Sequence, residues 1–419
     1  MSLTFTGQRR VSRLLVPLIL VFHASSAAAQ EWPQFRGPDG QGHSTERGLP
    51  TDWNESLNVV WKVPVQGRGW SSPVVAAGRV WLTTATPVGG DTSLRLLSFD
   101  TGTGRQALDV EVFRLRSASL LNAKNSHASP TPVVEGDLVY VDFGAEGTAA
   151  VSTSGGILWK VRLQYQSQHG NGGSPVLHGD LLIVNCDGFD EAFIIALDKH
   201  TGKTRWRTFR PRPWSQAYST PLAIRVADRD QIVSVGAFHA AAYDPLSGKE
   251  IWRVSYPDGF SNVPRPVYGD GLVFITTGFQ QPAILAVRPD GKGDVTRTHM
   301  AWTLSRGAPL TPSPLLVGAE LYVVTDAGIA SSIDARTGAI HWQQRLGGPV
   351  SASPVLADGR IYFLDEEGTT TVVSPATTFR RIATNTLDGP AFASMAVASG
   401  SFFIRTASHL YRLEARPAH

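Results

Sequence analysis

The segment ALDKHTGKTRW, from Ala196 to Trp206, is the clearest copy of a pattern that recurs through this 419-residue chain. The pattern is Ala-x-Asp-x-x-Thr-Gly-x-x-x-Trp, and similar copies run from Ala242 to Trp252 and from Ser332 to Trp342. The blocks that contain it are roughly 40–48 residues long and continue from near Trp61 to the C-terminus, a period typical of propellers and solenoids.

The start of each block also repeats. A short apolar strand follows a Ser/Thr-Pro step or its variant, and a second strand rich in β-branched and aromatic residues comes next. The eight openings are Ser72-Pro73, Thr131-Pro132, Ser174-Pro175, Thr220-Pro221, Arg265-Pro266, Ser313-Pro314, Ser353-Pro354 and Ser394-Met395. Proline fits at the first residue of a strand, where a missing N–H does not interrupt the ladder. Since no amphipathic helix pattern is visible, the sequence predicts an all-β chain.

The two ends of the chain predict how the ring closes. The last block, from Ala391, contains three strands and stops before a closing Trp strand. The segment NVVWKVPV around Trp61 is such a strand with no block before it. We therefore predict an eight-bladed β-propeller of four-stranded antiparallel blades, in which the N-terminal strand completes the last blade and removes the open edge. The alternative is seven blades with a side hairpin.

The residues of the repeated turn have structural explanations. An Asp side chain can accept hydrogen bonds from backbone N–H groups two or three residues later. Gly can adopt the left-handed conformation that ends the turn. The Trp is expected to pack against the neighbouring blade. Asp residues such as Asp198 are therefore poor candidates for catalysis.

Residues 1–29 have the composition of a secretory signal peptide. Arg9, Arg10 and Arg13 precede an apolar stretch, Leu14 to Phe22, that is too short to span a bilayer, and Ala27 to Ala29 offer a cleavage site. We expect export to the periplasm or the extracellular space, with cleavage near Ala29. The alternative is a membrane anchor.

The rest of the chain divides into an extended lead-in, residues 30–57, and a single propeller domain, residues 58–415. The chain has 38 Lys and Arg against 35 Asp and Glu, and three of the Arg lie in the signal segment, so the mature chain carries about zero formal charge. That balance argues against a nucleic-acid partner. We expect a monomer with no transmembrane segment in the mature chain. The single cysteine, Cys186, is expected to be a buried or half-buried thiol.

The repeated Ala-x-Asp-x-x-Thr-Gly-x-x-x-Trp turns resemble those of pyrroloquinoline quinone (PQQ)-type β-propellers. That superfamily includes quinoprotein alcohol dehydrogenases and the BamB subunit of the outer-membrane barrel-assembly machinery. The resemblance implies the propeller fold over essentially all of 58–415. In the enzymes of this superfamily, a pair of adjacent cysteines lies at the cofactor and a calcium ion is held by oxygen ligands. This chain has one cysteine, so the cysteine pair is absent.

Residues just before the first strand of each blade are expected to surround one mouth of the central channel, where converging polar and aromatic groups favour a binding site. The candidates for a ligand or cofactor site at this funnel are Arg68, Trp70, Asn125, His127, His169, Asn171, Trp214, Gln216, Tyr218, Asn262, Arg265 and Arg306. If PQQ binds, Arg265 or Arg306 is expected to pair with its carboxylates.

Two local clusters leave alternatives open. His127 and His169 occupy equivalent places in successive blades and could bind a metal or act as an acid–base pair, but hydrogen bonding to the backbone is the favoured interpretation. The acidic groups in NCDGFDE and FLDEEG could ligate calcium, but solvated hairpin carboxylates are favoured. We predict no metal site and identify no catalytic residue.

Three functions follow from these observations. The first is an exported binding or scaffold module for a protein or ligand of the cell envelope. The second is a PQQ- and calcium-dependent quinoprotein dehydrogenase. The third is binding of a carbohydrate or another small ligand at the aromatic funnel.

Overall fold

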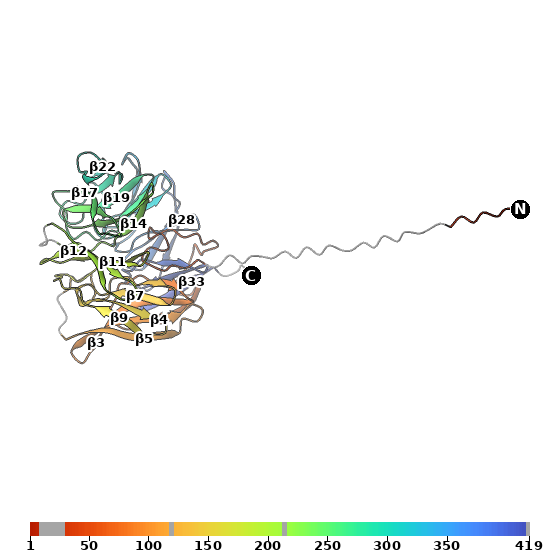
Figure 1. The fold of residues 1–419 in the computed structure, drawn as a ribbon, viewed down its shortest axis with the longest axis horizontal. Helices are drawn as coiled ribbons and strands as arrows, with labels where there is room; N and C mark the ends of the chain where they lie inside the picture. Colours follow the sequence, from red (N-terminus) through yellow and green to blue (C-terminus); the bar gives the residue numbers. More distant parts are fainter. Residues whose placement is uncertain (8–29, 117–120, 212–215, 416–419) are drawn as a thin grey trace.

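The computed structural model describes residues 1–7, 30–116, 121–211 and 216–415. The predicted signal peptide falls largely at residues 8–29, outside the described part. Within the described part no helix is long and apolar enough to span a bilayer. The chain forms eight sheets that follow one another around a ring, and Figure 1 shows them in sequence order.

The first four blades each contain four consecutive antiparallel strands. Blade 1 comprises β2 (Val74–Ala76), β3 (Arg79–Val88), β4 (Asp91–Asp100) and β5 (Gln106–Leu115). Blade 2 comprises β6 (Val133–Glu135), β7 (Leu138–Asp142), β8 (Thr148–Ser152) and β9 (Ile157–Val161), with a 3₁₀ turn at Gly144–Glu146. Blade 3 comprises β10 (Val176–His178), β11 (Leu181–Asp187), β12 (Ala192–Asp198) and β13 (Thr204–Phe209). Blade 4 comprises β14 (Leu222–Val226), β15 (Arg229–Val235), β16 (His239–Tyr243) and β17 (Glu250–Ser255).

The other four blades complete the ring. Blade 5 comprises β18 (Val267–Gly269), β19 (Leu272–Thr276), β20 (Ile284–Val287) and β22 (Met300–Leu304). Its insertion forms β21 (Gly293–Asp294), which pairs in parallel with β17. Blade 6 comprises β23 (Leu315–Val317), β24 (Glu320–Val324), β25 (Ile329–Asp334) and β26 (Ile340–Arg345). Blade 7 comprises β27 (Val355–Ala357), β28 (Arg360–Leu364), β29 (Thr369–Val373) and β30 (Arg381–Thr386).

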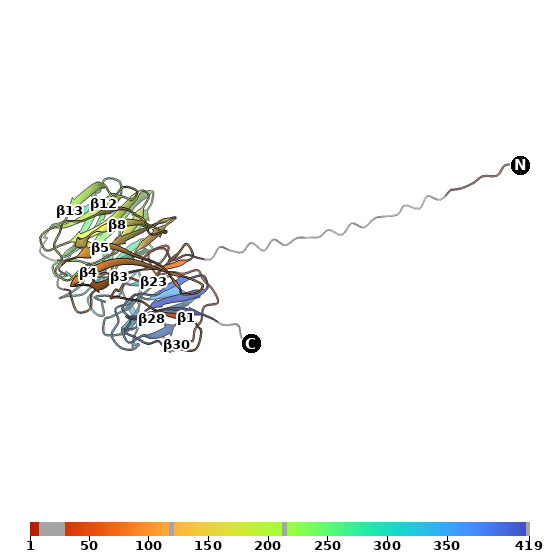
Figure 2. The ribbon, with the colours of Figure 1, turned by 90° about the horizontal axis from the view of Figure 1, so that it is seen from below.

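Blade 8 confirms the predicted closure. Its order is β1 (Val59–Pro64), β33 (His409–Glu414), β32 (Ser401–Arg405) and β31 (Ala396–Ala398). The N-terminal strand pairs antiparallel with the C-terminal one, and Trp61 lies opposite Arg412. In Figure 2 the orange β1 lies among the blue C-terminal strands. The eight-bladed architecture is therefore correct, and the alternative of seven blades is excluded.

The repeated turns fasten each blade to the next. In blade 3 an Asp198 oxygen accepts the backbone N–H and the hydroxyl of Thr201, each at 2.9 Å. The indole N–H of Trp159, on the outer strand of blade 2, donates to the Lys199 carbonyl of that turn. Gly202 has a φ of +70°, and a Cβ there would come within 2.6 Å of the Trp159 ring. The motif thus closes its own turn and receives the preceding blade's Trp.

The same docking recurs around the ring. Four other indole N–H groups donate to a carbonyl of the next blade's turn: Trp61 to Thr101, Trp206 to Pro245, Trp302 to Ala335 and Trp342 to Ala376. Blade 4 differs, because Trp252 donates to Gln231 within its own sheet. Blade 5, which follows Trp252 in the ring, carries an insertion in place of the repeated turn that would receive this indole.

Residues 30–57, called the cap below, close one end of the central channel. Trp32 exchanges backbone hydrogen bonds with Val75, and Gly42 accepts the N–H of Leu356. Glu46 accepts the N–H groups of Ser399 and Gly400 in blade 8. Val75 and Leu356 lie in the first strands of blades 1 and 7, and Ser399 and Gly400 lie in the turn between the first and second strands of blade 8. The end of the channel that the cap covers is called the closed end. The opposite end, where the Ser/Thr-Pro steps begin, is called the mouth.

The cap also contributes to the largest hydrophobic cluster. Trp32 and Trp53 are buried against strands of blades 1, 7 and 8. The Trp53 ring centroid lies 5.5 Å from that of Phe402 and 6.1 Å from that of Tyr362. The sequence predicted an extended lead-in without a repeat. In the structure its tryptophan side chains are buried, because they pack between blades 1, 7 and 8.

Candidate functional site

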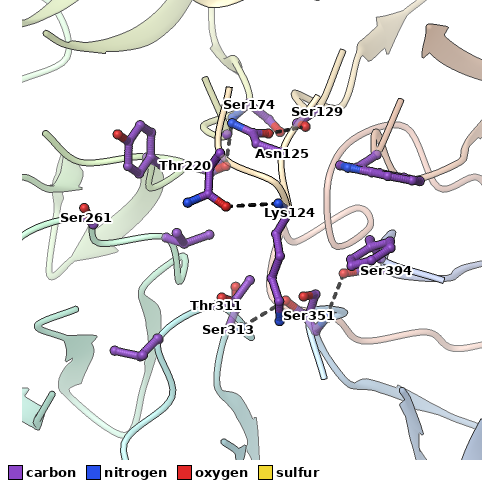
Figure 3. Close-up of a pocket in the computed structure, with 18 of the residues that line it drawn as sticks. Lys124, Asn125, Ser129, Ser174, Thr220, Ser261, Thr311, Ser313, Ser351 and Ser394 are labelled. Atoms are coloured by element: carbon purple, nitrogen blue, oxygen red, sulfur yellow. Dashed lines mark hydrogen bonds between the residues drawn. The ribbon is translucent and has the colours of Figure 1, made fainter. Parts of the chain in front are cut away.

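A cavity of about 610 Å³ occupies the central channel and opens at the mouth. Its lining residues come from the segments that precede the first strands, together with Phe35 of the cap. Figure 3 shows that these side chains converge from several blades. The cavity has the size and the mixed apolar and polar lining of small-ligand sites.

A ring of hydroxyl groups runs around the cavity wall. Its members are Thr131, Ser174, Thr220, Ser313, Ser353 and Ser394, all of which are buried and line the cavity. Each Oγ accepts a backbone N–H from the equivalent position of the preceding blade, at 2.8 to 3.0 Å. The Ser/Thr-Pro step therefore links neighbouring blades and places a hydroxyl in the channel. In blade 5 Arg265 takes the place of the hydroxyl residue.

Aromatic side chains supply much of the apolar surface. Trp70 packs against Phe392 in a tilted arrangement, with ring centroids 4.6 Å apart, and both line the cavity. Phe260 and Phe279 form an edge contact at 5.6 Å on another part of the wall. Phe35 of the cap also lines it. These rings offer flat apolar surfaces to a ligand that enters from the mouth.

Two buried guanidinium groups lie next to the hydroxyl ring on the side of the cap. Arg265 donates to the carbonyls of Pro221 and Phe35, both at distances of 2.8 to 3.0 Å. Arg36 donates to the carbonyls of Pro314 and Pro354. Burial lowers the pKa of Arg265 to about 10 and that of Arg36 to about 9, so both remain charged at neutral pH.

An ion pair connects two sides of the mouth. Lys124 precedes β6, and its Nζ lies 2.7 Å from Oε1 of Glu366, which belongs to the hairpin between β28 and β29. The Ser351 hydroxyl donates to the same carboxylate oxygen. Asp326 is the carboxylate that lines the cavity, and its Oδ2 accepts the N–H groups of Leu310 and Thr311.

Four of the twelve predicted site residues line this cavity: Trp70, Asn125, His169 and Tyr218. The Asn125 amide donates to the carbonyl of His169, which joins two neighbouring mouth segments. The Tyr218 hydroxyl donates to Gln216, and burial raises the pKa of that hydroxyl. Asn125 and Tyr218 are thus held in place by neighbours, while their surfaces face the cavity.

Four other predicted residues lie outside the lining. Asn171 donates to the buried carboxylate of Asp142, and Asn262 donates to the Thr276 carbonyl. Gln216 accepts the Tyr218 hydroxyl proton. The pKa of His127 is lowered by burial and by the charge of Arg68. His127 does not line the cavity with His169, so the cavity holds one of the two imidazoles.

The remaining predicted residues are Arg68, Arg265, Arg306 and Trp214. Arg68 is exposed, donates to the Ala123 carbonyl and lies over the Trp70 ring. Arg306 is also exposed and does not line the cavity. Arg265 holds backbone carbonyls near the cap, as described above. Trp214 lies outside the described residues.

The structure corrects one interpretation of the acidic hairpins. Asp187 was expected to be solvated, but it is buried and accepts Nη1 of Arg210 at 2.8 Å. Asp365 is also buried, and its Oδ1 accepts the N–H groups of Glu367 and Thr369. Asp365 thus orders its own hairpin, whereas Asp187 is paired with the buried Arg210 that follows β13. Asp190 and Glu191 are exposed, as expected.

One group of potential metal ligands occurs among the described residues, at blade 6. Atoms of Glu320, Asp334 and His341 lie within 4.8 Å of one another. His341 is already paired with Glu320 at 2.9 Å, and Asp334 accepts the N–H and hydroxyl of Thr337 in its turn. Because each group has a structural partner and none lines the cavity, this cluster does not extend the candidate site.

The lining residues do not match the needs of PQQ with calcium. PQQ carries several carboxylates, and calcium prefers a cluster of oxygen ligands. The described lining residues include one Lys or Arg side chain, that of Lys124, and one carboxylate, that of Asp326. Arg265 and Arg36 direct their N–H groups to backbone carbonyls. The donor set therefore suits a ligand with less charge than PQQ.

Comparisons with known structures show the same fold with low sequence identity. BamB from Moraxella catarrhalis is 13% identical, with a TM-score of 0.60, over 86% of this chain and 98% of that chain. A europium-containing methanol dehydrogenase is 11% identical, with a TM-score of 0.66, over 91% of this chain and 90% of that chain. The computationally designed Ika8 protein is 10% identical, with a TM-score of 0.60, over 85% of this chain and all of that chain.

The sequence itself matches a family model in three overlapping stretches, residues 44–235, 111–290 and 236–381. No curated protein matches the sequence. The three stretches together cover most of the chain and seven of the eight blades. The chain therefore belongs to the PQQ-repeat propeller family described as outer membrane protein assembly factor BamB.

Proposed function

We propose that this chain is an exported binding module of the cell envelope, which holds a protein segment or a small ligand at the mouth of its central channel. The observation that carries the proposal is the cavity, which is open at the mouth, bounded by the cap and lined by aromatic rings and hydroxyl groups. The family description and the composition of residues 1–29 support the envelope location.

The chemistry of the wall favours binding over catalysis. Asn125 and Tyr218 each have a neighbour within the wall, and Lys124 is paired with Glu366. Asp326 orders the backbone of a mouth segment. A nucleophile paired with a general base would be the sign of covalent catalysis. Within the described lining residues no such pair is present.

Affinity capture from an envelope extract tests the proposal, with the mature chain from Gln30 as bait. Two variants provide a matched comparison, because both remove an exposed apolar side chain. Phe279 is 53% exposed at the cavity, whereas Leu246 is 82% exposed at a closing turn of blade 4. We expect Phe279→Ala to lose the captured partner and Leu246→Ala to retain it. Equal capture by both variants would count against a site at the mouth.

A quinoprotein dehydrogenase is the competing function. The size of the cavity and its flat aromatic walls would admit a planar cofactor, although the charged groups are few. Titration with PQQ and calcium, followed by the melting temperature, separates the two functions, since a ligand that binds the folded state must raise that temperature. A saturable rise would establish cofactor binding and call for an alcohol screen. An unchanged melting temperature at high cofactor would remove this function.

A further inference from the structure

The hydroxyl ring has hydrogen-bond donors with no acceptor. Each of the six hydroxyl oxygens accepts one backbone N–H, as described above, and each O–H group still has a proton to donate. Within the described part of the chain, none of the six protons has an acceptor. All six residues are at most 6% exposed, and all line the cavity. The open side of these hydroxyls is the channel itself.

Two buried guanidinium groups lie beside part of this ring of donors. Arg36 and Arg265 bind the carbonyls of Pro221, Pro314 and Pro354, each of which directly follows a ring residue. Neither guanidinium forms an ion pair with a carboxylate in the described residues. The nearby carboxylate of Asp39 is engaged by His43 at 2.6 Å. That carboxylate also attracts both guanidinium groups, so one anion is shared by two buried cations and His43.

Lys124 adds a cation at the mouth, but Glu366 holds it. The Lys124 side chain is 52% exposed, whereas that of Glu366 is 13% exposed and also accepts the Ser351 hydroxyl. The lysine side chain is therefore the more accessible partner of the pair, and its ammonium group can contact a second anion in the cavity. Figure 3 shows Lys124 extending between Ser351 and the opposite wall of the cavity.

We propose that the cavity is a site for an organic anion that has one anionic group on an aromatic or other apolar body. The hydroxyl ring donates to the anionic group, and the aromatic walls receive the body. Lys124 and the two buried arginines attract the anionic group, and Asp326, whose Oδ2 accepts two backbone N–H groups, is the lining carboxylate that opposes them. This inference rests on the proposed binding function and names its ligand class. It disfavours a neutral carbohydrate, which would not use the charge.

Two fluorescent probes that differ by one charged group test the proposal. 8-Anilinonaphthalene-1-sulfonate carries a sulfonate, and N-phenyl-1-naphthylamine is the same ring system without it. Both are titrated into the folded mature chain and two variants, Lys124→Gln and Glu366→Gln. We expect the first variant to weaken sulfonate binding by about two- to fivefold and the second to strengthen it by about the same factor, as for a partly exposed ion pair.

The neutral probe is the control for structural damage. It should bind the wild type and both variants equally, and added salt should weaken the sulfonate probe alone. A disturbed cavity would change both probes in the same direction, so opposite effects of the two variants support a charge-specific site. Saturable binding of both probes without any effect of the variants would overturn the anion proposal and leave the binding function standing. Failure of both probes, together with equal capture by Phe279→Ala and Leu246→Ala, would overturn both.

Discussion

The two ends of the central channel are built from the same blades but differ in how their polar groups are used. At the closed end, the cap fills the channel, and Arg36 and Arg265 donate to backbone carbonyls. At the mouth, hydroxyl groups and aromatic rings line a cavity. The comparison indicates that the closed end contributes mainly to stability and that the mouth leaves groups available to a ligand.

A pair of tryptophan substitutions measures this difference directly. Trp32 of the cap is fully buried, so Trp32→Ala should lower the free energy of unfolding by about 3–5 kcal/mol. Trp70 at the mouth is half-buried, and Trp70→Ala should cost about 1–2 kcal/mol. Urea unfolding of both variants gives the two values. A larger loss for Trp70→Ala would reverse the assignment of stability to the closed end.

Buried carboxyl groups should also give the protein a pH-dependent stability, and Asp142 is expected to make one such contribution. Asp142 ends β7 and accepts hydrogen bonds from Thr148, Gly144 and Asn171. Burial raises the pKa of this carboxyl from 3.8 to about 7. The folded state therefore binds an extra proton between these values, and stability should fall as the pH rises by at most about 1.4 kcal/mol per pH unit.

The measurement is the free energy of unfolding at several pH values for the wild type and for Asp142→Asn. Turn carboxylates with lowered pKa values, such as those of Asp198 and Asp334, act in the opposite direction, and Asp187, whose pKa is also raised by burial, acts in the same direction; all three are present in both proteins. The difference between the two curves isolates Asp142. A difference that does not change with pH would show that Asp142 has an ordinary pKa.

A substitution in the hydroxyl ring should have a smaller effect. Ser313→Ala leaves the buried Arg265 N–H without an acceptor and should cost about 1–3 kcal/mol. Ser72 lines the same cavity, but its hydroxyl has no hydrogen-bond partner in the described residues, so Ser72→Ala should cost below about 1 kcal/mol. Thermal unfolding of both variants tests whether the ring oxygens serve as inter-blade acceptors. Equal losses would argue against that role.

The repeat made the fold predictable. Each block has the same local needs, namely a turn closed by Asp, a Gly that admits an indole ring and a Trp that reaches the next blade. Asp198, Gly202 and Trp159 meet these needs in the structure. Closure by β1 was also predictable, because the last block lacked one strand. These features depend on contacts within a block or between adjacent blocks, which a periodic sequence records.

The site was less predictable because it depends on contacts across the ring. The sequence predicted that Arg265 lies at the mouth, but it did not predict that the side chain extends toward the Phe35 carbonyl. Phe35 lies in the aperiodic cap, so no pattern marked it as part of the cavity. The Ser/Thr-Pro steps were visible as strand starts. That their hydroxyl groups form a ring could be recognised only from the distances between neighbouring blades in the structure.

The closure of the last blade by β1 has a consequence for folding. In the pairing of β1 with β33, Trp61 lies opposite Arg412. Arg36 of the cap binds carbonyls that lie 278 and 318 residues further along the chain. The entropy of closing loops of this length must be lost before these contacts form, so the ring closes late and slowly. Until then β1 and the outer edge of β33 are unpaired and can associate with other chains. The completed chain is therefore the first species in which every blade has both neighbours.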